Sequence, residues 1–145
     1  MNNEPYIHFD CTQTDFSDCK NEQQFKMKYI KTQLREAFNY VFCIETEETV
    51  KGFPDVMCLF KNGRANFCEF KYSNASGKIK FQPTQPSFYR QHPDMDIWVI
   101  AYNQKTKSVV EFPVWDMSSV KGERRFYMNE KAEVDLCKAE KLIQS

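Results

Sequence analysis

The sequence predicts a single α/β domain over residues 1–145, with a mixed β-sheet flanked by helices in the order α-β-β-β-α-β-β-α. Segments 22–40 and 129–144 repeat apolar residues at helical spacing. Between them lie short apolar runs of strand length, including a hairpin pattern over 56–71 and an uninterrupted apolar run over 97–102. Alternating helical and strand-like segments of this kind build a sheet with helices on its faces.

The composition supports one folded core and excludes several classes of protein. With 145 residues, 41% of them hydrophobic and 13 of them Phe, the chain is large enough for one core and too apolar for a disordered protein. Twenty Lys and Arg balance twenty Asp and Glu, so any nucleic-acid-binding surface must be a local patch. No apolar run reaches the length of a membrane span. The six cysteines form no C-x-x-C pair and the N-terminus is not a signal peptide, so we expect reduced thiols in a cytoplasmic chain.

The first helix is predicted from Glu22 to about Tyr40. Asn21 or Asp18 could cap its start, and an acid in the first turn, such as Glu22, is favoured by the helix dipole. A strand over 41–45 is expected next. The apolar stripe on which the helix would pack consists of Met27, Ile30, Leu34, Ala37, Phe38 and Val41.

A β-hairpin is predicted within 56–71, because an Asn-Gly turn separates two apolar runs. Side chains alternate between the two faces of a strand. We therefore expect Glu69 and Lys71 to share one face of the second strand, while Cys68 and Phe70 point into the core from the other face.

The length of the turn decides whether Asp55 joins the charged pair. A two-residue turn would place Asp55 opposite Phe70, whereas a three-residue loop over 61–63 would place it opposite Glu69. The longer loop needs a residue in the left-handed region at its third position, and Gly63 stands there. We therefore expect Asp55 on the face that carries both charged residues of the second strand.

Four further elements complete the predicted order. A second helix is expected within 81–92, followed by a strand over 97–102 in the interior of the sheet. The next strand, over 108–112, should lie at an edge because a proline ends it. A last helix is expected over 129–144, with Asn129 as its cap and with Ala132, Leu136, Ala139 and Ile143 as its apolar stripe.

Two carboxylates and a lysine on one face of a hairpin suit the metal-assisted hydrolysis of a phosphodiester. Mg²⁺ takes oxygen ligands, commonly one or two carboxylates together with waters and substrate phosphates. A bound cation can make a nucleophile from water, and a nearby ammonium can hold that water and stabilise the developing charge. An ordinary cross-strand salt bridge among Asp55, Glu69 and Lys71 is the alternative explanation of the same pattern.

The motif and its surroundings resemble a known family. Gly-Phe-Pro-Asp-Val at 52–56, then Glu-Phe-Lys at 69–71 and glutamines at 82–85, resembles the signature of the PD-(D/E)XK nuclease superfamily. The surroundings are similar to its VRR-NUC and Holliday-junction-resolvase-like branch, which includes stand-alone phage proteins. The resemblance covers about 22–103. It implies a restriction-endonuclease-like core and a metal-dependent endonuclease that cleaves DNA, in the host cytoplasm if the chain is viral. Because a chain of 145 residues has little room for an element that reads base sequence, we expect it to select DNA structure, namely junctions, flaps or ends.

The resemblance also implies roles for individual residues. Asp55, Glu69 and the backbone carbonyl of Phe70 would bind Mg²⁺ or Mn²⁺, and Lys71 would position or activate the attacking water. A first-helix acid would help complete the metal site; Glu22 matches best, with Glu36 and Glu45 as alternatives. A glutamine at the start of the second helix would lie near metal and substrate; Gln85 fits best and Gln82 second.

Other readings stay open at this point. The same residues would serve an RNA-directed nuclease, and a non-catalytic module that binds nucleic acid or protein could keep the fold. A symmetric junction would suit a homodimer. Basic residues in predicted loops or on the second helix, some beside aromatics, are typical of contacts to nucleic acid. The candidates are Lys78, Lys80, Arg90, Arg124 and Arg125.

Overall fold

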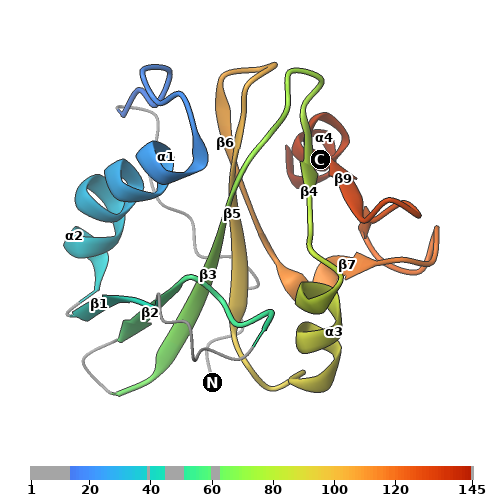
Figure 1. The fold of residues 1–145 in the computed structure, drawn as a ribbon, viewed down its shortest axis with the longest axis horizontal. Coiled ribbons are helices and arrows are strands. Elements are labelled where there is room, and N and C mark those ends of the chain that lie inside the picture. The colour runs from blue at the N-terminus through green and yellow to red at the C-terminus, as the bar shows by residue number, and fades with distance from the viewer. Residues whose placement is uncertain (1–13, 39, 45–50, 60–62, 145) are drawn as a thin grey trace.

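A mixed five-stranded sheet forms the centre of the molecule (Figure 1). The computed structural model describes residues 14–38, 40–44, 51–59 and 63–144. The strand order is β1-β2-β3-β5-β6; β3 and β5 run parallel, and the other neighbours run antiparallel. This confirms the predicted α/β class and its mixed sheet. The strands are β1 (Tyr40–Cys43), β2 (Val56–Leu59), β3 (Ala65–Tyr72), β5 (Ile97–Asn103) and β6 (Ser108–Pro113).

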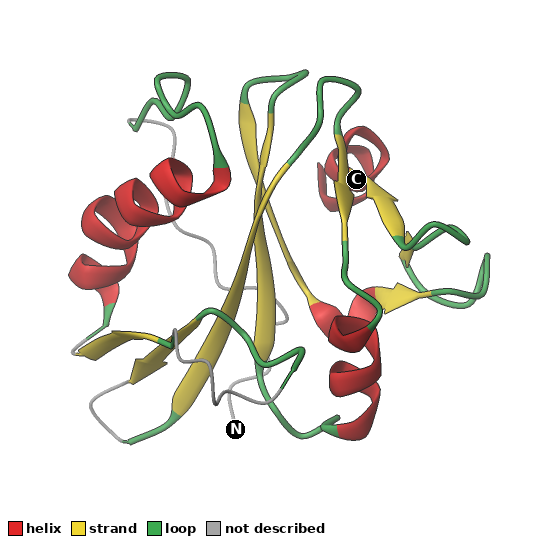
Figure 2. Cartoon of the chain, viewed as in Figure 1, coloured by secondary structure: helices red, strands yellow, loops and turns green. Residues whose placement is uncertain are grey.

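Helices cover both faces of this sheet (Figure 2). On one face lies α1 (Glu22–Tyr29), which continues through a π-helical turn, η1 (Ile30–Leu34), into α2 (Arg35–Ala37). On the other face lie α3 (Thr84–Gln91) and α4 (Leu136–Gln144). Among the described ranges, no helix is both long and apolar enough to cross a membrane.

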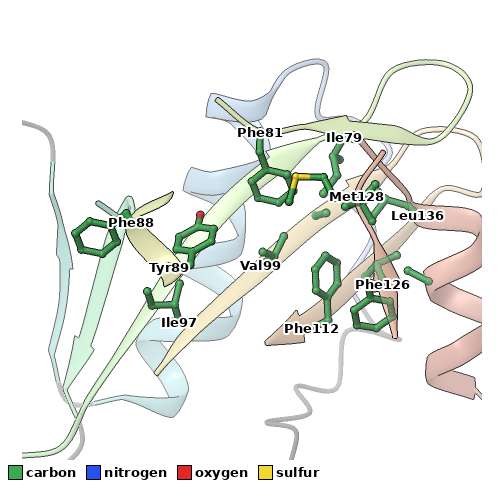
Figure 3. Close-up of a cluster of buried hydrophobic side chains, with 14 residues drawn as sticks. Ile79, Phe81, Phe88, Tyr89, Ile97, Val99, Phe112, Phe126, Met128 and Leu136 are labelled. Carbon is green, nitrogen blue, oxygen red and sulfur yellow. The ribbon is translucent and has the colours of Figure 1, made fainter. Parts of the chain in front are cut away.

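Each face of the sheet has its own apolar cluster. Phe25, Tyr29 and Leu34 pack on the first face with Cys68 and Phe70, as expected for these two strand residues. The second cluster fills the space between the sheet, α3 and α4 (Figure 3). Because successive side chains of β3 point to opposite faces of the sheet, its charged residues point into this second space, toward α3. The second cluster includes Ile79, Phe81, Phe88, Tyr89, Val99, Phe112 and Leu136.

The first helix begins where the sequence predicts and buries part of the predicted stripe, namely Ile30, Leu34 and Phe38. Asn21 is the cap, because its side chain accepts from the backbone N–H of Gln24 at 2.8 Å. Met27, which was expected to be buried, is 42% exposed, whereas Phe25 and Tyr29 are wholly buried. The buried face of α1 therefore runs through Phe25 and Tyr29, one helical turn apart, and continues into Ile30 and Leu34.

The C-terminal helix is shorter than predicted, and the prediction of Asn129 as its cap is wrong. The Asn129 side chain accepts from the backbone N–H groups of Lys131 and Glu133, at 2.9 and 3.0 Å, and so closes a turn instead. The chain then forms β9 (Glu133–Asp135) within the range predicted as helix. This strand pairs with β4 (Lys78–Lys80), whose residues were expected to lie in a loop. The helix starts only at Leu136, after Asp135 accepts from the Cys137 N–H at 3.0 Å.

The remaining elements close the second face. The edge position predicted for the strand that ends in proline is confirmed, because β6 is the last strand of the sheet. After it come a 3-10 turn, η2 (Val114–Asp116), and the short parallel pair β7 (Met117–Ser118) and β8 (Phe126–Tyr127). The five cysteines that the structure describes are free thiols.

Candidate active site

The hairpin register brings the two predicted carboxylates opposite each other. Val56 pairs with Cys68 and Met57 with Phe67, so one further step in the same register puts Asp55 opposite Glu69. Gly63, at the end of the turn, has a φ of 85° in the left-handed region. This confirms the register expected from the longer of the two predicted turns, and the shared face that depends on it; residues 61 and 62 of the turn lie outside the described residues.

Asp55 is fixed by both its main chain and its side chain. Its carbonyl accepts from the Ile44 N–H at 2.7 Å, and its carboxylate accepts from the Phe70 N–H at 3.1 Å. In this register Pro54 stands opposite Phe70. Because proline has no N–H, Pro54 cannot donate a hydrogen bond to the Phe70 carbonyl. Because the N–H and C=O of one strand residue point to the same edge, the Phe70 carbonyl faces the side on which Asp55 lies.

Glu69 is a buried acid with an unused oxygen. The residue is 3% exposed, and its Oε1 has no hydrogen-bond partner among the described residues. Burial, followed by the negative charge of Asp55, raises the pKa of Glu69 to about 9, although the charge of Lys71 acts in the opposite direction. A buried carboxylate without a partner charge is unfavourable, so Glu69 either keeps its proton or binds a cation.

Lys71 is held in place from α3. Its Nζ donates to Gln85 Oε1 at 2.9 Å and lies 4.7 Å from the centre of the Phe81 ring. The same Gln85 oxygen accepts from the Gln82 N–H at 2.9 Å, which fixes the amide. The Gln82 residue itself is exposed. The contact with Lys71 therefore belongs to Gln85, the first of the two sequence candidates.

Glu22 stands at the start of α1, close enough to feel the charges of the site. The residue is exposed by surface area, yet partial burial of its carboxyl raises its pKa. The charge of Lys71 lowers that pKa, and the charge of Asp55 raises it. Glu36 is exposed on α2, and Glu45 lies outside the described residues. Of the two described acids, we relate Glu22 to the site.

These donors fit a hard cation better than a zinc centre. Among the residues that the structure describes, no three His, Cys, Asp or Glu side chains gather in a way that could hold a metal ion. A structural or catalytic zinc site needs three or four such side chains. Mg²⁺ is commonly bound by one or two carboxylates, with waters and substrate phosphates in its other positions. Asp55, Glu69 with its free oxygen, and the Phe70 carbonyl match that second pattern.

Tyr89 lies close enough to the site to be affected by its charges, although the sequence predicted no role for this residue. It is 7% exposed, and its hydroxyl has no hydrogen-bond partner among the described residues. Burial raises its pKa, and the charges of Glu69 and Asp55 add to this rise. The signal for it in the sequence is its spacing, since Tyr89 follows Gln85 by one helical turn on the same helix.

We expect Tyr89→Phe to leave the free energy of unfolding within about 1 kcal/mol of wild type, or to raise it, because no protein hydrogen bond is lost. Tyr29→Phe is the matched control. The Tyr29 hydroxyl donates to Glu111 Oε1 at 2.7 Å, so its removal should cost roughly 1–3 kcal/mol. Urea unfolding of the three proteins compares them. A loss for Tyr89→Phe as large as that for Tyr29→Phe would contradict an unpartnered hydroxyl.

The state of Glu69 makes stability depend on pH. Its ordinary pKa of 4.5 applies in the unfolded chain, and about 9 applies in the folded protein. Between these values the unfolded chain has released a proton that the folded chain keeps, so this group's contribution to stability falls as the pH rises. Glu69→Gln does not titrate. We therefore expect the variant to gain stability relative to wild type with rising pH, as measured by urea unfolding at both ends of this range. A constant difference would contradict the assignment.

The predicted nucleic-acid contacts fall into two groups. Arg90 and Arg124 line one cavity of about 570 Å³, and Lys78 and Arg125 line another of about 310 Å³. Arg125 is already engaged, because it donates to the Leu142 carbonyl and lies 4.0 Å from the Asp116 carboxylate. Lys80, at the end of β4, is exposed. These residues therefore do not form one patch.

Comparisons with known proteins do not add a family: no protein-family model matches the chain, and no curated protein matches it. The functional argument must therefore come from the residues and their arrangement.

Proposed function

We propose that this protein is a divalent-metal-dependent endonuclease that hydrolyses DNA phosphodiester bonds, on a PD-(D/E)XK fold of the VRR-NUC type. One observation carries the proposal. A buried carboxyl, Glu69, keeps an oxygen without a partner in the part of the chain that the structure describes, directly across the strand pair from Asp55 and two residues from a lysine that α3 holds in place. An ordinary salt bridge would use its carboxylate oxygens on the lysine, whereas Lys71 donates to an amide.

The arrangement of elements is consistent with this family. An acid starts the first helix, the hairpin supplies the two carboxylates and the lysine, and the following helix supplies the glutamine. The hairpin's second strand then pairs in parallel with β5, as in a mixed sheet with a crossover helix. The acid, the two hairpin carboxylates, the lysine and the glutamine thus follow one another along the chain in the order of the family's motif residues.

The carboxylates of Asp55 and Glu69 and the carbonyl of Phe70 would hold the cation, Mg²⁺ or Mn²⁺. When bound, such a cation supplies positive charge to the scissile phosphate and lowers the pKa of water. Binding requires Glu69 to lose its proton, so affinity should increase with pH.

The chain's own residues would perform the other tasks. The Lys71 ammonium, which Gln85 aims, would hold the attacking water and stabilise charge that develops on the phosphate oxygens. Gln85 would keep that ammonium in place while substrate enters. Glu22 lies at the exposed side of the site, where it would orient water or metal ligands.

The residues act on phosphate, which DNA and RNA share, so the choice of polymer rests on the resemblance. The experiment is cleavage of labelled four-way junction, flap, single-stranded and duplex DNA, with matched RNA, in Mg²⁺, Mn²⁺ or EDTA. We expect cleavage of branched or flapped DNA that EDTA stops. Cleavage of RNA alone would correct the polymer. No cleavage of any substrate would overturn the enzyme and leave a binding module.

A further inference from the structure

A second feature lies next to α3 and is lined by none of the site's charged residues. It is a cavity of about 570 Å³ between the C-terminal half of α3 and the segment 114–124. Cavities of roughly 300–1,000 Å³ are the size that small ligands occupy. Neither the carboxylates nor Lys71 lines it, so the proposed chemistry does not account for it.

Two arginines with no ion-pair partner among the described residues line this cavity. Arg90 comes from α3 and Arg124 from the loop before β8, and both are exposed. By contrast, Arg64 is paired with Asp96 at 3.1 Å. One acid, Glu123, also lines the cavity and accepts from the Ser118 hydroxyl at 2.9 Å. The two cations outnumber it, so the cavity favours an anion.

An exposed aromatic ring adds a flat apolar wall. Trp115 is 44% exposed, and its indole packs edge-on against Trp98, with ring centres 5.9 Å apart. This contact fixes the ring while much of it stays open to solvent. Guanidinium groups and an aromatic ring around one cavity match a ligand that has both phosphate and a flat ring, which is a nucleotide.

We propose that this cavity binds an unpaired nucleotide of the nucleic acid substrate, with Arg90 and Arg124 on its phosphates and Trp115 against its base. The base must be unpaired, because the rings of a duplex are stacked inside it and cannot reach a protein cavity. The proposal rests on the proposed function and narrows it to substrates with single-stranded nucleotides, such as flaps and frayed ends, rather than intact duplex.

Helix α3 connects the two places. Gln85, in its first turn, holds Lys71, and Tyr89 and Arg90, one turn later, line the cavity. Tyr89 takes part in both, since the charges of Asp55 and Glu69 also act on its hydroxyl. A strand bound in the cavity would thus be held by the same helix that positions the lysine.

The test is fluorescence anisotropy of a labelled single-stranded oligodeoxynucleotide and of a hairpin duplex with the same sequence, using the whole chain in EDTA. The variants are Arg90→Ala with Arg124→Ala, and separately Trp115→Leu. The matched control is Lys31→Ala with Arg35→Ala, which removes two cations on the opposite face of the sheet. We expect each cavity variant to bind the single strand roughly tenfold more weakly, with little change for duplex or for the control.

Equal losses in the control, or unchanged single-strand binding in the double arginine variant, would overturn the inference. The double variant guards against misfolding of Trp115→Leu, since it changes only exposed side chains. Asp55→Asn separates the two proposals. If wild type cleaves nothing, yet both wild type and Asp55→Asn bind the single strand through the cavity, the nuclease fails and the nucleotide site stands. If cleavage depends on Asp55 and the cavity variants bind normally, only the nucleotide site fails.

Discussion

Replacing Lys71 with methionine should lower metal-dependent cleavage by roughly a hundred- to a thousandfold, the cost of removing one preorganised group that stabilises charge in the transition state. Lys71 is 7% exposed, and its ammonium is aimed by Gln85 at 2.9 Å. Methionine keeps the length of the side chain and its packing against Phe81, so the fold should survive. Initial rates on the preferred DNA substrate, with circular dichroism to check folding, measure the effect.

The matched control is Lys31→Met, which makes the same chemical change at an exposed position on η1, on the opposite face of the sheet. It should cleave within a few-fold of wild type. Gln85→Ala should give a smaller loss than Lys71→Met, because it frees the ammonium without removing it. Wild-type cleavage by Lys71→Met, or an equal loss in the control, would show that the lysine takes no part in the reaction.

Gly52→Ala should cause the largest loss of stability among single substitutions near the site. Gly52 has a φ of 89°, and a Cβ there would lie 2.2 Å from the Thr84 carbonyl oxygen and 2.9 Å from Phe88 Cβ. These atoms belong to the backbone and to the root of a packed ring, so no rotamer change relieves the contact. The loop that carries Asp55 must then move away from α3. We expect a loss above about 3 kcal/mol, beyond the usual range for a point substitution.

Gly63→Ala separates the contact from the backbone conformation. Gly63 has a φ of 85°, but a Cβ there would have no atom within 4 Å. Its replacement should cost only the left-handed conformation, roughly 1–2 kcal/mol. Urea unfolding of both variants gives the difference between them. Equal losses would mean that Gly52 matters only for its φ and that the loop is not pressed against the helix.

Much of the site could be predicted because it depends on local rules. Strand alternation gives the shared face of Glu69 and Lys71, and a glycine at the third loop position selects the register that adds Asp55. For the cap of the first helix the sequence offers two candidates, Asn21 and Asp18, and the structure shows Asn21 in that place. Such features need only the neighbouring residues, so one sequence by itself is enough to predict them.

The errors came from interactions between distant parts of the chain. β4 is a strand only because β9 pairs with it. In this pairing Ile79 lies opposite Val134, which is 55 residues later in the chain. Each of these strands is too short for its alternating pattern to identify it in the sequence. The apolar pattern alone also cannot decide whether Val134 belongs to a strand or to a helix. Tyr89 was missed for the same reason, because the charge of Glu69 acts on its hydroxyl only after α3 packs on the sheet.

The most direct test of the metal site is a calorimetric titration with Mn²⁺ near neutral pH, repeated in buffers of different ionisation enthalpy. Asp55 and Glu69 should together bind the ion, and about one proton should be released, since Glu69 keeps its proton up to a pKa of about 9. Asp55→Asn should abolish binding, whereas Asp94→Asn, an exposed acid, should not. No binding at millimolar Mn²⁺, or binding that Asp55→Asn leaves unchanged, would contradict the account.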